Sequence, residues 1–285
     1  MYKGVLIDWG GVLTTGMYDS IMAWVAADRI DANRYREVMR DMVASAYDEG
    51  AYSDRADSRA ATRAATRADG KPAGRADGKA AGEPLNAAAS ATAITVAALE
   101  SAIMDEVAAS ARSGHGPGFD SPVNPIHALE RGEIDPREFE RDLASRLLTL
   151  DGVPPLADGL LNRMFAAFEP VEPMYAMLRT ARAAGLKTCL LSNSWGNDYP
   201  RESWVGAFDE VVISGEVGMR KPEARIFHHT LGVIGLSPGQ CVFVDDIVSN
   251  IAAAEALGIT GVHHTDATTT IGELESLLGV PLRVV

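Results

Sequence analysis

The sequence predicts an α/β protein in which a mostly parallel sheet carries helices on both faces and is interrupted by a helical insertion. Three observations support this prediction. A fully apolar strand stands near the N-terminus, at residues 4–7. Helices and strands alternate from Pro173 onward. Residues 14–169 between these two parts show helical patterns and no convincing strand. The sheet domain is therefore expected to be discontinuous in sequence.

The first strand and the insertion follow from their apolar patterns. An apolar run of this kind is typical of a strand buried on both faces, at the centre of a parallel sheet. Apolar residues recur at helical spacing over residues 20–46, which predicts helices there. A further helix is expected over residues 136–148, after a turn that ends in Asp135-Pro136, and residues 156–168 continue the helical pattern.

One part of the insertion, at about residues 53–82, has a different composition. It consists almost entirely of Ala, Arg, Asp, Gly, Thr and Lys, and it contains the octads RADGKPAG at Arg67–Gly74 and RADGKAAG at Arg75–Gly82. Such a segment can bury little apolar surface, so disorder or a loose helix is expected. The basic residues could form an interaction patch, but a solvated insertion is the simpler interpretation.

The second half alternates in the way that builds a doubly wound, Rossmann-like parallel sheet. The expected elements are a helix at 174–184, strands at 187–191 and 211–214, a helix at 222–234, a strand at 242–244, a helix at 250–257 and a strand near Val262. We therefore expect a core of residues 1–13 and 170–285 and an all-helical cap of residues 14–169.

Composition restricts the class of protein. The 285 residues carry a formal net charge of −13, which opposes binding to a nucleic-acid backbone. No apolar run is long enough to cross a membrane, and the N-terminal apolar stretch is too short for a secretory signal. The two cysteines, Cys189 and Cys241, lie in apolar runs, so buried reduced thiols are expected. We predict a cytoplasmic protein.

Polar residues follow several of the predicted strands. They are Asp8 after the first strand, Ser192 and Asn193 after the second, Lys221 before a helix, and Asp245, Asp246 and Asn250 after a later strand. Each has an ordinary explanation, as a turn residue, a helix-terminal residue or a solvated charge. The carboxyl ends of parallel strands share one edge of the sheet, however, and ligands bind at that edge. Their convergence favours a catalytic site.

These residues also resemble the four motifs of the haloacid dehalogenase superfamily, in the order that this family requires. The motifs are VLIDWGGVL, LLSN, GMRKPEARIF and VFVDDIVSN. The resemblance covers Lys3 to Leu13, about Pro170 to Thr265, and the LERGEIDPREFE stretch of the insertion. Within the superfamily, the sequence looks most similar to the glucose-1-phosphatase-like branch and to the N-terminal phosphatase domain of soluble epoxide hydrolases.

The resemblance implies a Mg²⁺-dependent phosphatase that acts on a small phosphorylated metabolite, such as a sugar phosphate. Asp8 matches the nucleophile, which splits hydrolysis into two steps through an aspartyl-phosphate. Mg²⁺ prefers hard oxygen ligands. By resemblance these come from Asp8, the Gly10 carbonyl and Asp246, with Asp245 and Asn250 supporting or completing the site. Ser192, Asn193 and Lys221 match residues that bind the phosphoryl group. A monomer or homodimer is expected.

The match departs from most family phosphatases at Gly10, where those enzymes carry a second Asp as general acid and base. Such a group is typically worth about 10²- to 10⁴-fold in rate, so a slow or selective enzyme is expected. The departure leaves open a weakly active or non-catalytic protein that binds a phosphorylated metabolite or a partner.

Two sibling chemistries also stay open. Dehalogenases of the family lack the second Asp but use no metal, and the pair Asp245-Asp246 argues against them. Phosphonate-cleaving relatives share the Asp-Trp-small-Gly start, but they need a lysine in the cap. Here the cap holds only Lys71 and Lys79, both in the octads. Phosphomonoester hydrolysis therefore remains the first prediction.

Overall fold

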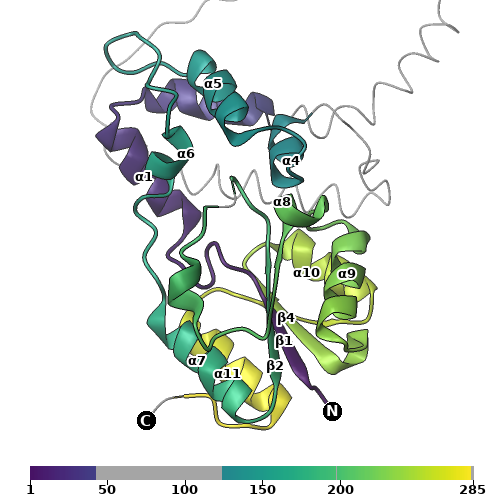
Figure 1. Cartoon of the computed structure of the whole chain (residues 1–285). Helices are drawn as coiled ribbons and strands as arrows, with labels where there is room; N and C mark the ends of the chain where they lie inside the picture. The colour runs from purple at the N-terminus through teal and green to yellow at the C-terminus, as the bar shows by residue number, and fades with distance from the viewer. Residues whose placement is uncertain (43–123, 197, 284–285) are drawn as a thin grey trace, which may run out of the picture. The chain divides into compact units, whose positions relative to one another are not determined.

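The computed structural model describes residues 1–42, 124–196 and 198–283, and Figure 1 shows their arrangement. All of these residues belong to one compact unit. The octads, the low-complexity segment at about 53–82 and the expected helical pattern at 43–46 lie outside the described residues, so those predictions are not tested here.

The sheet has five parallel strands in the order β3-β2-β1-β4-β5. They are β1 (Gly4–Ile7), β2 (Lys187–Ser192), β3 (Glu210–Ile213), β4 (Cys241–Asp245) and β5 (Thr260–His263). The first strand is central, as its apolar sequence predicts, and Ile7 lies in register with Leu190 of β2 and Val244 of β4. This register brings Asp8 next to Asp245 at the carboxyl edge of the sheet.

Helices cover both faces of the sheet, which confirms the predicted Rossmann-like α/β fold (Figure 1). They are α7 (Glu172–Ala183), α9 (Ala224–Ile234), α10 (Val248–Ala256) and α11 (Ala267–Leu278). The short helix α8 (Ser214–Val217) directly follows β3, and short 3₁₀ turns lie at Arg201–Trp204 and Pro238–Gln240. Alternate residues of β1 face opposite sides, as a strand requires. Val5 and Ile7 pack in the core with α7 and α11, whereas Leu6 packs in the core with α9 and α10.

Most predicted elements of the second half are present, but their boundaries differ in places. Helix α10 begins at Val248 rather than at residue 250, because the Asp245 side chain accepts a hydrogen bond from Ile247 N at 2.8 Å and fixes the turn before the helix. The strand expected to end at Ser214 ends one residue earlier, and Ser214 begins α8. Helix α11 was not predicted from the sequence.

A second group of helices builds its own apolar core, which includes Trp24, Leu129, Phe139 and Leu143. These helices are α1 (Met17–Ala27), a helix over residues 32–42, α4 (Pro125–Glu130), α5 (Pro136–Arg146) and α6 (Leu160–Met164). Only α6 represents the helical pattern expected over 156–168, since Gly159 before it adopts a left-handed conformation. None of the helices in the described segments is long and apolar enough to span a bilayer.

The chain crosses between these helices and the sheet at two places that lie side by side. Thr14 and Pro170 form an antiparallel bridge, and Val171 N donates to Leu13 O at 2.9 Å. The predicted boundaries of the cap, at 13/14 and 169/170, fall at these crossings. The assignment of residues 14–169 as a cap domain, separate from the catalytic core, remains a prediction. The two cysteines are buried and unbonded, as expected.

Candidate active site

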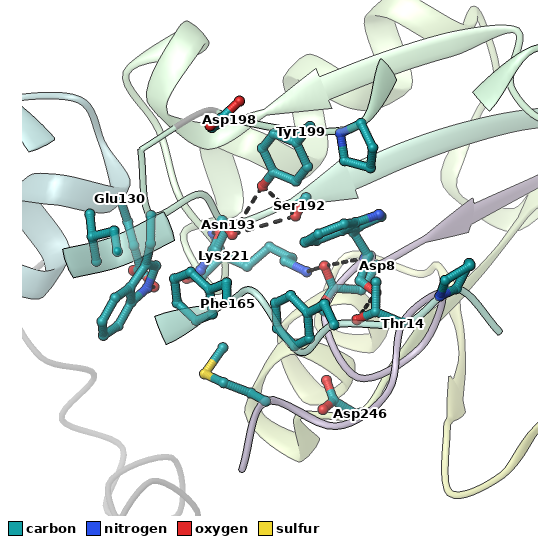
Figure 2. A pocket seen from close by; sticks show the side chains of 18 of the residues that line it. Asp8, Thr14, Glu130, Phe165, Ser192, Asn193, Asp198, Tyr199, Lys221 and Asp246 are labelled. Carbon is teal, nitrogen blue, oxygen red and sulfur yellow. Dashed lines mark hydrogen bonds and ion pairs between the residues drawn. The ribbon is translucent and has the colours of Figure 1, made fainter. Parts of the chain in front are cut away.

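Four charged residues that the sequence singled out meet at the carboxyl edge of the sheet. We call Asp8, Lys221, Asp245 and Asp246 the catalytic charge cluster. Lys221 Nζ lies 2.8 Å from Asp8 Oδ1 and 2.7 Å from Asp245 Oδ2, and the lysine side chain is only 1% exposed. Figure 2 shows the ammonium group pointing at Asp8. Burial alone would lower the pKa of Lys221, but the charges of Asp245 and Asp8 outweigh burial and raise it.

The loop that carries Lys221 is held by Asn193. Lys221 N–H donates to Asn193 Oδ1 at 2.8 Å, and Asn193 Nδ2 donates to Lys221 O at 3.0 Å. Both polar ends of the Asn193 side chain are therefore used by the main chain of Lys221. The sequence predicts that Asn193 binds substrate; its contacts instead suit a residue that positions the lysine.

Asp245 is fully buried and its two oxygens already have several partners. Besides Lys221, Asn250 Nδ2 lies 3.1 Å from each oxygen, and Ile247 N donates to Oδ1. Asn250 thus orients Asp245, and the expectation that the two residues support or complete a metal site stays a prediction. The hydrogen bonds of Asp245 fit a residue that holds Lys221 in place.

Asp246 differs from Asp245 because its carboxylate has no ion pair among the described residues. Burial raises its pKa to about 8, and the negative charges of Asp8 and Asp245 contribute to the shift. Burial likewise raises the pKa of Asp8 to about 6, although Lys221 opposes this shift. The cluster therefore holds three acidic groups against a single base, and this imbalance disfavours the charged form of Asp246 unless a further cation is bound nearby.

This excess of carboxylate oxygens fits a divalent cation. Ligand oxygens of Asp8, Asp245 and Asp246 lie within 4.8 Å of one another. The loop after Asp8 approaches Asp246 closely: Gly11 has φ +75°, and a Cβ atom there would overlap Asp246 Oδ2. Hard carboxylate oxygens are the donors that Mg²⁺ prefers. Gly10 lines the same cavity, and its carbonyl as a ligand stays a prediction.

Ser192 lies beside this cluster at the end of β2, where the sequence places it. It is buried, and its Oγ lies 2.9 Å from the hydroxyl of Tyr199. Burial raises the pKa of Tyr199, so its hydroxyl stays protonated and able to donate. Tyr199 could not be recognised from the sequence, because it lies in an irregular loop without a motif.

The cluster opens into a cavity of about 550 Å³ whose other walls come from the cap helices and from the loop after β2. Aromatic rings dominate these walls. They belong to Tyr175 and to a group of five further residues, Trp9, Phe165, Phe168, Trp195 and Tyr199. We call these five residues the aromatic wall. Sequence reasoning missed it, since its members come from three separate segments.

A second group of charges lies beside the first and joins the cap helices to the core. We call Glu130, Arg131, Glu133, Arg220, Glu223 and Arg225 the anchoring cluster. Arg220 Nε is paired with Glu130, and Arg131 Nη1 lies 3.3 Å from Glu223 Oε1. Arg131, Glu130 and Glu223 are all at least nine-tenths buried. Since Arg220 precedes Lys221 directly, these pairs tie the end of α4 to the loop of the lysine.

The two more exposed members, Glu133 and Arg225, complete the anchoring cluster at its edge. Glu133 binds Arg131 with two hydrogen bonds of 2.6 and 2.8 Å, and Arg225 pairs with Glu223 at 2.5 Å. Every acid in this cluster therefore has an arginine partner. The histidines take no part in either set of ion pairs within the described residues.

Comparison with known proteins identifies the family. The family model described as haloacid dehalogenase-like hydrolase matches residues 2–258. The chain belongs to the haloacid dehalogenase-like hydrolases. It is therefore an enzyme of the hydrolase class, and the resemblance seen in its motifs is confirmed.

Three relatives illustrate the range of this family. The chain is similar to the sesquiterpene phosphatase astK of Aspergillus oryzae, with 32% identity over 157 residues, 53% of this chain and 78% of the relative. It is 37% identical to the phosphoserine phosphatase of Thermus thermophilus over 100 residues, 32% of this chain and 40% of the relative. It is 27% identical to bifunctional epoxide hydrolase 2 of Rattus norvegicus over 128 residues, 42% of this chain and 23% of the relative. The chain thus spans less than half of the last two proteins.

Proposed function

We propose that this hydrolase is a Mg²⁺-dependent phosphatase of a small phosphorylated metabolite, with Asp8 as the nucleophile. The observation that carries the proposal is the contact of 2.8 Å between Lys221 Nζ and Asp8 Oδ1 inside a cluster with excess negative charge. A buried carboxylate held by an ammonium group at the end of a central strand is oriented for attack on a group in the cavity.

The positions of the side chains support a reaction in two steps. An Asp8 oxygen attacks the phosphorus, the bond from phosphorus to the substrate oxygen breaks, and an aspartyl-phosphate forms. The leaving oxygen takes a proton from solvent water and departs as the alcohol, because Gly10 offers no acid. Water then attacks the aspartyl-phosphate, which releases inorganic phosphate and restores Asp8. Lys221 and Ser192 hold the phosphoryl oxygens in both steps. Mg²⁺, when bound by Asp8 and Asp246, supplies positive charge that offsets the repulsion between carboxylates and phosphate.

The relatives support the reaction type but leave the alcohol open. Two of them are phosphatases by name, one acting on a sesquiterpene and one on phosphoserine. These substrates differ greatly in polarity. A sugar phosphate, expected from the sequence, therefore stays one prediction among several.

The first experiment measures inorganic phosphate release from a panel of phosphomonoesters, with Mg²⁺ and with EDTA. We expect turnover that requires Mg²⁺, together with a phosphorylated protein that hydroxylamine discharges after acid quench, as an acyl phosphate does. Release of inorganic phosphate with no phosphorylated protein after acid quench would contradict Asp8 as the nucleophile. No release from any ester, with Mg²⁺ still bound, would favour phosphonate cleavage or a binding function.

A further inference from the structure

We infer that the alcohol part of the substrate is apolar, so that this enzyme acts on the phosphate monoester of a hydrocarbon-rich alcohol rather than on a sugar phosphate. The inference rests on the proposed phosphatase function and goes further by assigning the chemical class of the leaving alcohol. It depends on three features of the cavity: its rings, its charges and its hydrogen-bonding groups.

The rings of the aromatic wall form one continuous series. Tyr199 and Phe168 each contact Trp9, with ring centroids 4.9 and 5.3 Å away, respectively. Phe168 stacks on Phe165 at 5.3 Å, and Phe165 meets Trp195 at 6.0 Å. The series thus runs from Tyr199 through Trp9, which directly follows the proposed nucleophile, and on through Phe168 and Phe165 to Trp195. A group bound through its phosphate at Asp8 would therefore lie along aromatic surface.

The charges of the cavity leave no place for a second anion. Lys221 is the only cationic residue among the described residues that line it, and this lysine is already engaged by Asp8 and Asp245. The acidic Glu130 is neutralised by Arg220. A carboxylate or a second phosphate on the substrate would be desolvated without a partner, which is costly. Phosphoserine, bisphosphates and nucleotides are therefore poor fits.

The hydrogen-bonding groups are also unsuited to a sugar. Most polar side chains of the cavity have protein partners already: Ser192 binds Tyr199, Asn193 binds Lys221, and Asn250 binds Asp245. The exception is the indole Nε1 of Trp9, a single buried donor without a hydrogen-bond partner among the described residues. Two further polar residues of the lining, Asn162 and Ser203, are exposed, and Ser203 Oγ donates to Pro200 O at 2.7 Å. Sugar hydroxyls that lose water here would remain unpaired, at a cost for each. An alkyl group loses nothing and gains contact with the rings.

The test compares phosphate esters of primary alcohols with similar leaving-group chemistry, because Gly10 supplies no general acid and a better leaving group would bias the result. The series is n-butyl, n-hexyl and n-octyl phosphate, against glycerol 3-phosphate, glucose 6-phosphate and phosphoserine. We expect kcat/KM to rise about fourfold for each added methylene that the cavity buries, the equivalent of about 0.8 kcal/mol. Equal values along the alkyl series, or a preference for the polar esters, would overturn the inference.

Two further readouts separate this inference from the proposed function. Turnover of p-nitrophenyl phosphate reports phosphatase activity whatever the natural alcohol is. If that ester and the alkyl esters are all inert, the proposed function fails. Binding is then measured on its own, by tryptophan fluorescence of an Asp8→Asn variant titrated with octyl phosphate and with glycerol 3-phosphate. Tighter binding of the octyl ester supports the apolar cavity, and equal binding refutes it.

A pair of variants locates the effect in the aromatic wall. Phe168→Asn should lower the ratio of kcat/KM for octyl phosphate to that for glycerol 3-phosphate by about tenfold or more, and Phe168→Leu should restore most of it. Leu156→Asn, at a residue that is 70% exposed and outside the cavity, is the matched control and should leave the ratio unchanged. An equal loss on both substrates in Phe168→Asn, or an unchanged ratio, would contradict contact between Phe168 and the alcohol.

Discussion

The catalytic charge cluster and the anchoring cluster are both buried ionic groups, and they are joined through the neighbouring residues Arg220 and Lys221. The first holds three carboxylates and one ammonium group. The second holds three carboxylates and three guanidinium groups, all of them paired. The number of acidic groups thus equals the number of basic groups in the anchoring cluster and exceeds it in the catalytic charge cluster.

The difference in charge pairing indicates that the anchoring cluster stabilises the fold and that the catalytic charge cluster serves the reaction. A buried charge is tolerated when it is paired and hydrogen-bonded, and removing one partner is costly. The anchoring cluster meets this condition and ties the cap helices to the loop of Lys221. The catalytic charge cluster does not meet it, which raises the pKa of Asp246 to about 8 and that of Asp8 to about 6. An imbalance of this kind indicates a place for a cation and for reacting groups.

The largest effect is expected for Asp8→Asn in the catalytic charge cluster. Removal of a nucleophile should lower kcat by about 10³-fold or more. The fold should remain intact, because the raised pKa of Asp8 means that the folded state already disfavours its charged form. Phosphate release and circular dichroism check the two parts. Turnover at the wild-type rate would show that the mechanism is wrong.

The next effect is expected in the anchoring cluster, where Arg220→Met leaves Glu130 buried and unpaired. We expect a loss of about 3–5 kcal/mol in the free energy of unfolding, measured with urea. Arg220→Met combined with Glu130→Gln should recover part of this loss, since the unpaired charge is gone. Arg179→Met, which breaks an exposed pair with Glu172, is the control and should cost about 1 kcal/mol or less. Equal losses for Arg220→Met and Arg179→Met would refute the distinction.

A smaller effect is expected from Mg²⁺ itself. At about 100 times its dissociation constant, a ligand that binds only the folded state stabilises it by about 2.7 kcal/mol. We therefore expect Mg²⁺ to raise the melting temperature of the wild type and to have little effect on Asp246→Asn. Glu133→Gln, in the anchoring cluster, should respond as the wild type does. A full Mg²⁺ response in Asp246→Asn would exclude Asp246 as a ligand.

The smallest effect concerns His127, in α4 beside the anchoring cluster. Burial lowers its pKa from 6.5 to about 3, with contributions from the positive charges of Arg220 and Arg131. In the unfolded chain His127 takes up a proton near pH 6.5, whereas in the folded chain it stays neutral until about pH 3. The free energy of unfolding therefore falls as the pH drops from about 6.5 towards 3. Between pH 7.5 and 5.5 the wild type should lose about 1 kcal/mol more than His127→Gln in urea unfolding. Identical pH profiles would contradict the assignment.

The sequence determined the order of strands and helices and the residues at the strand ends. Runs such as Gly4–Ile7 are apolar throughout because both of their faces are buried, and this local signal survives without a structure. In a parallel sheet the carboxyl ends meet at one edge. The approach of Asp8, Ser192 and Asp246 could therefore be predicted from their positions after the strands, whereas Lys221 follows helix α8 and was placed by its motif. The boundaries of α10 could not, since they depend on the side chain of Asp245.

The tertiary structure alone decided which partner each of these residues takes. Asn193 follows a strand as expected, yet only the fold shows that its amide holds the main chain of Lys221. The aromatic wall joins Trp9 to Phe165 and Trp195, and the anchoring cluster joins Glu130 to Arg220, 90 residues away in the sequence. Such contacts arise where helices pack against a sheet and against loops. Which side chains become neighbours depends on shape and on distance in space. Unlike the apolar face of a helix or strand, this choice of partners leaves no periodic pattern in the sequence.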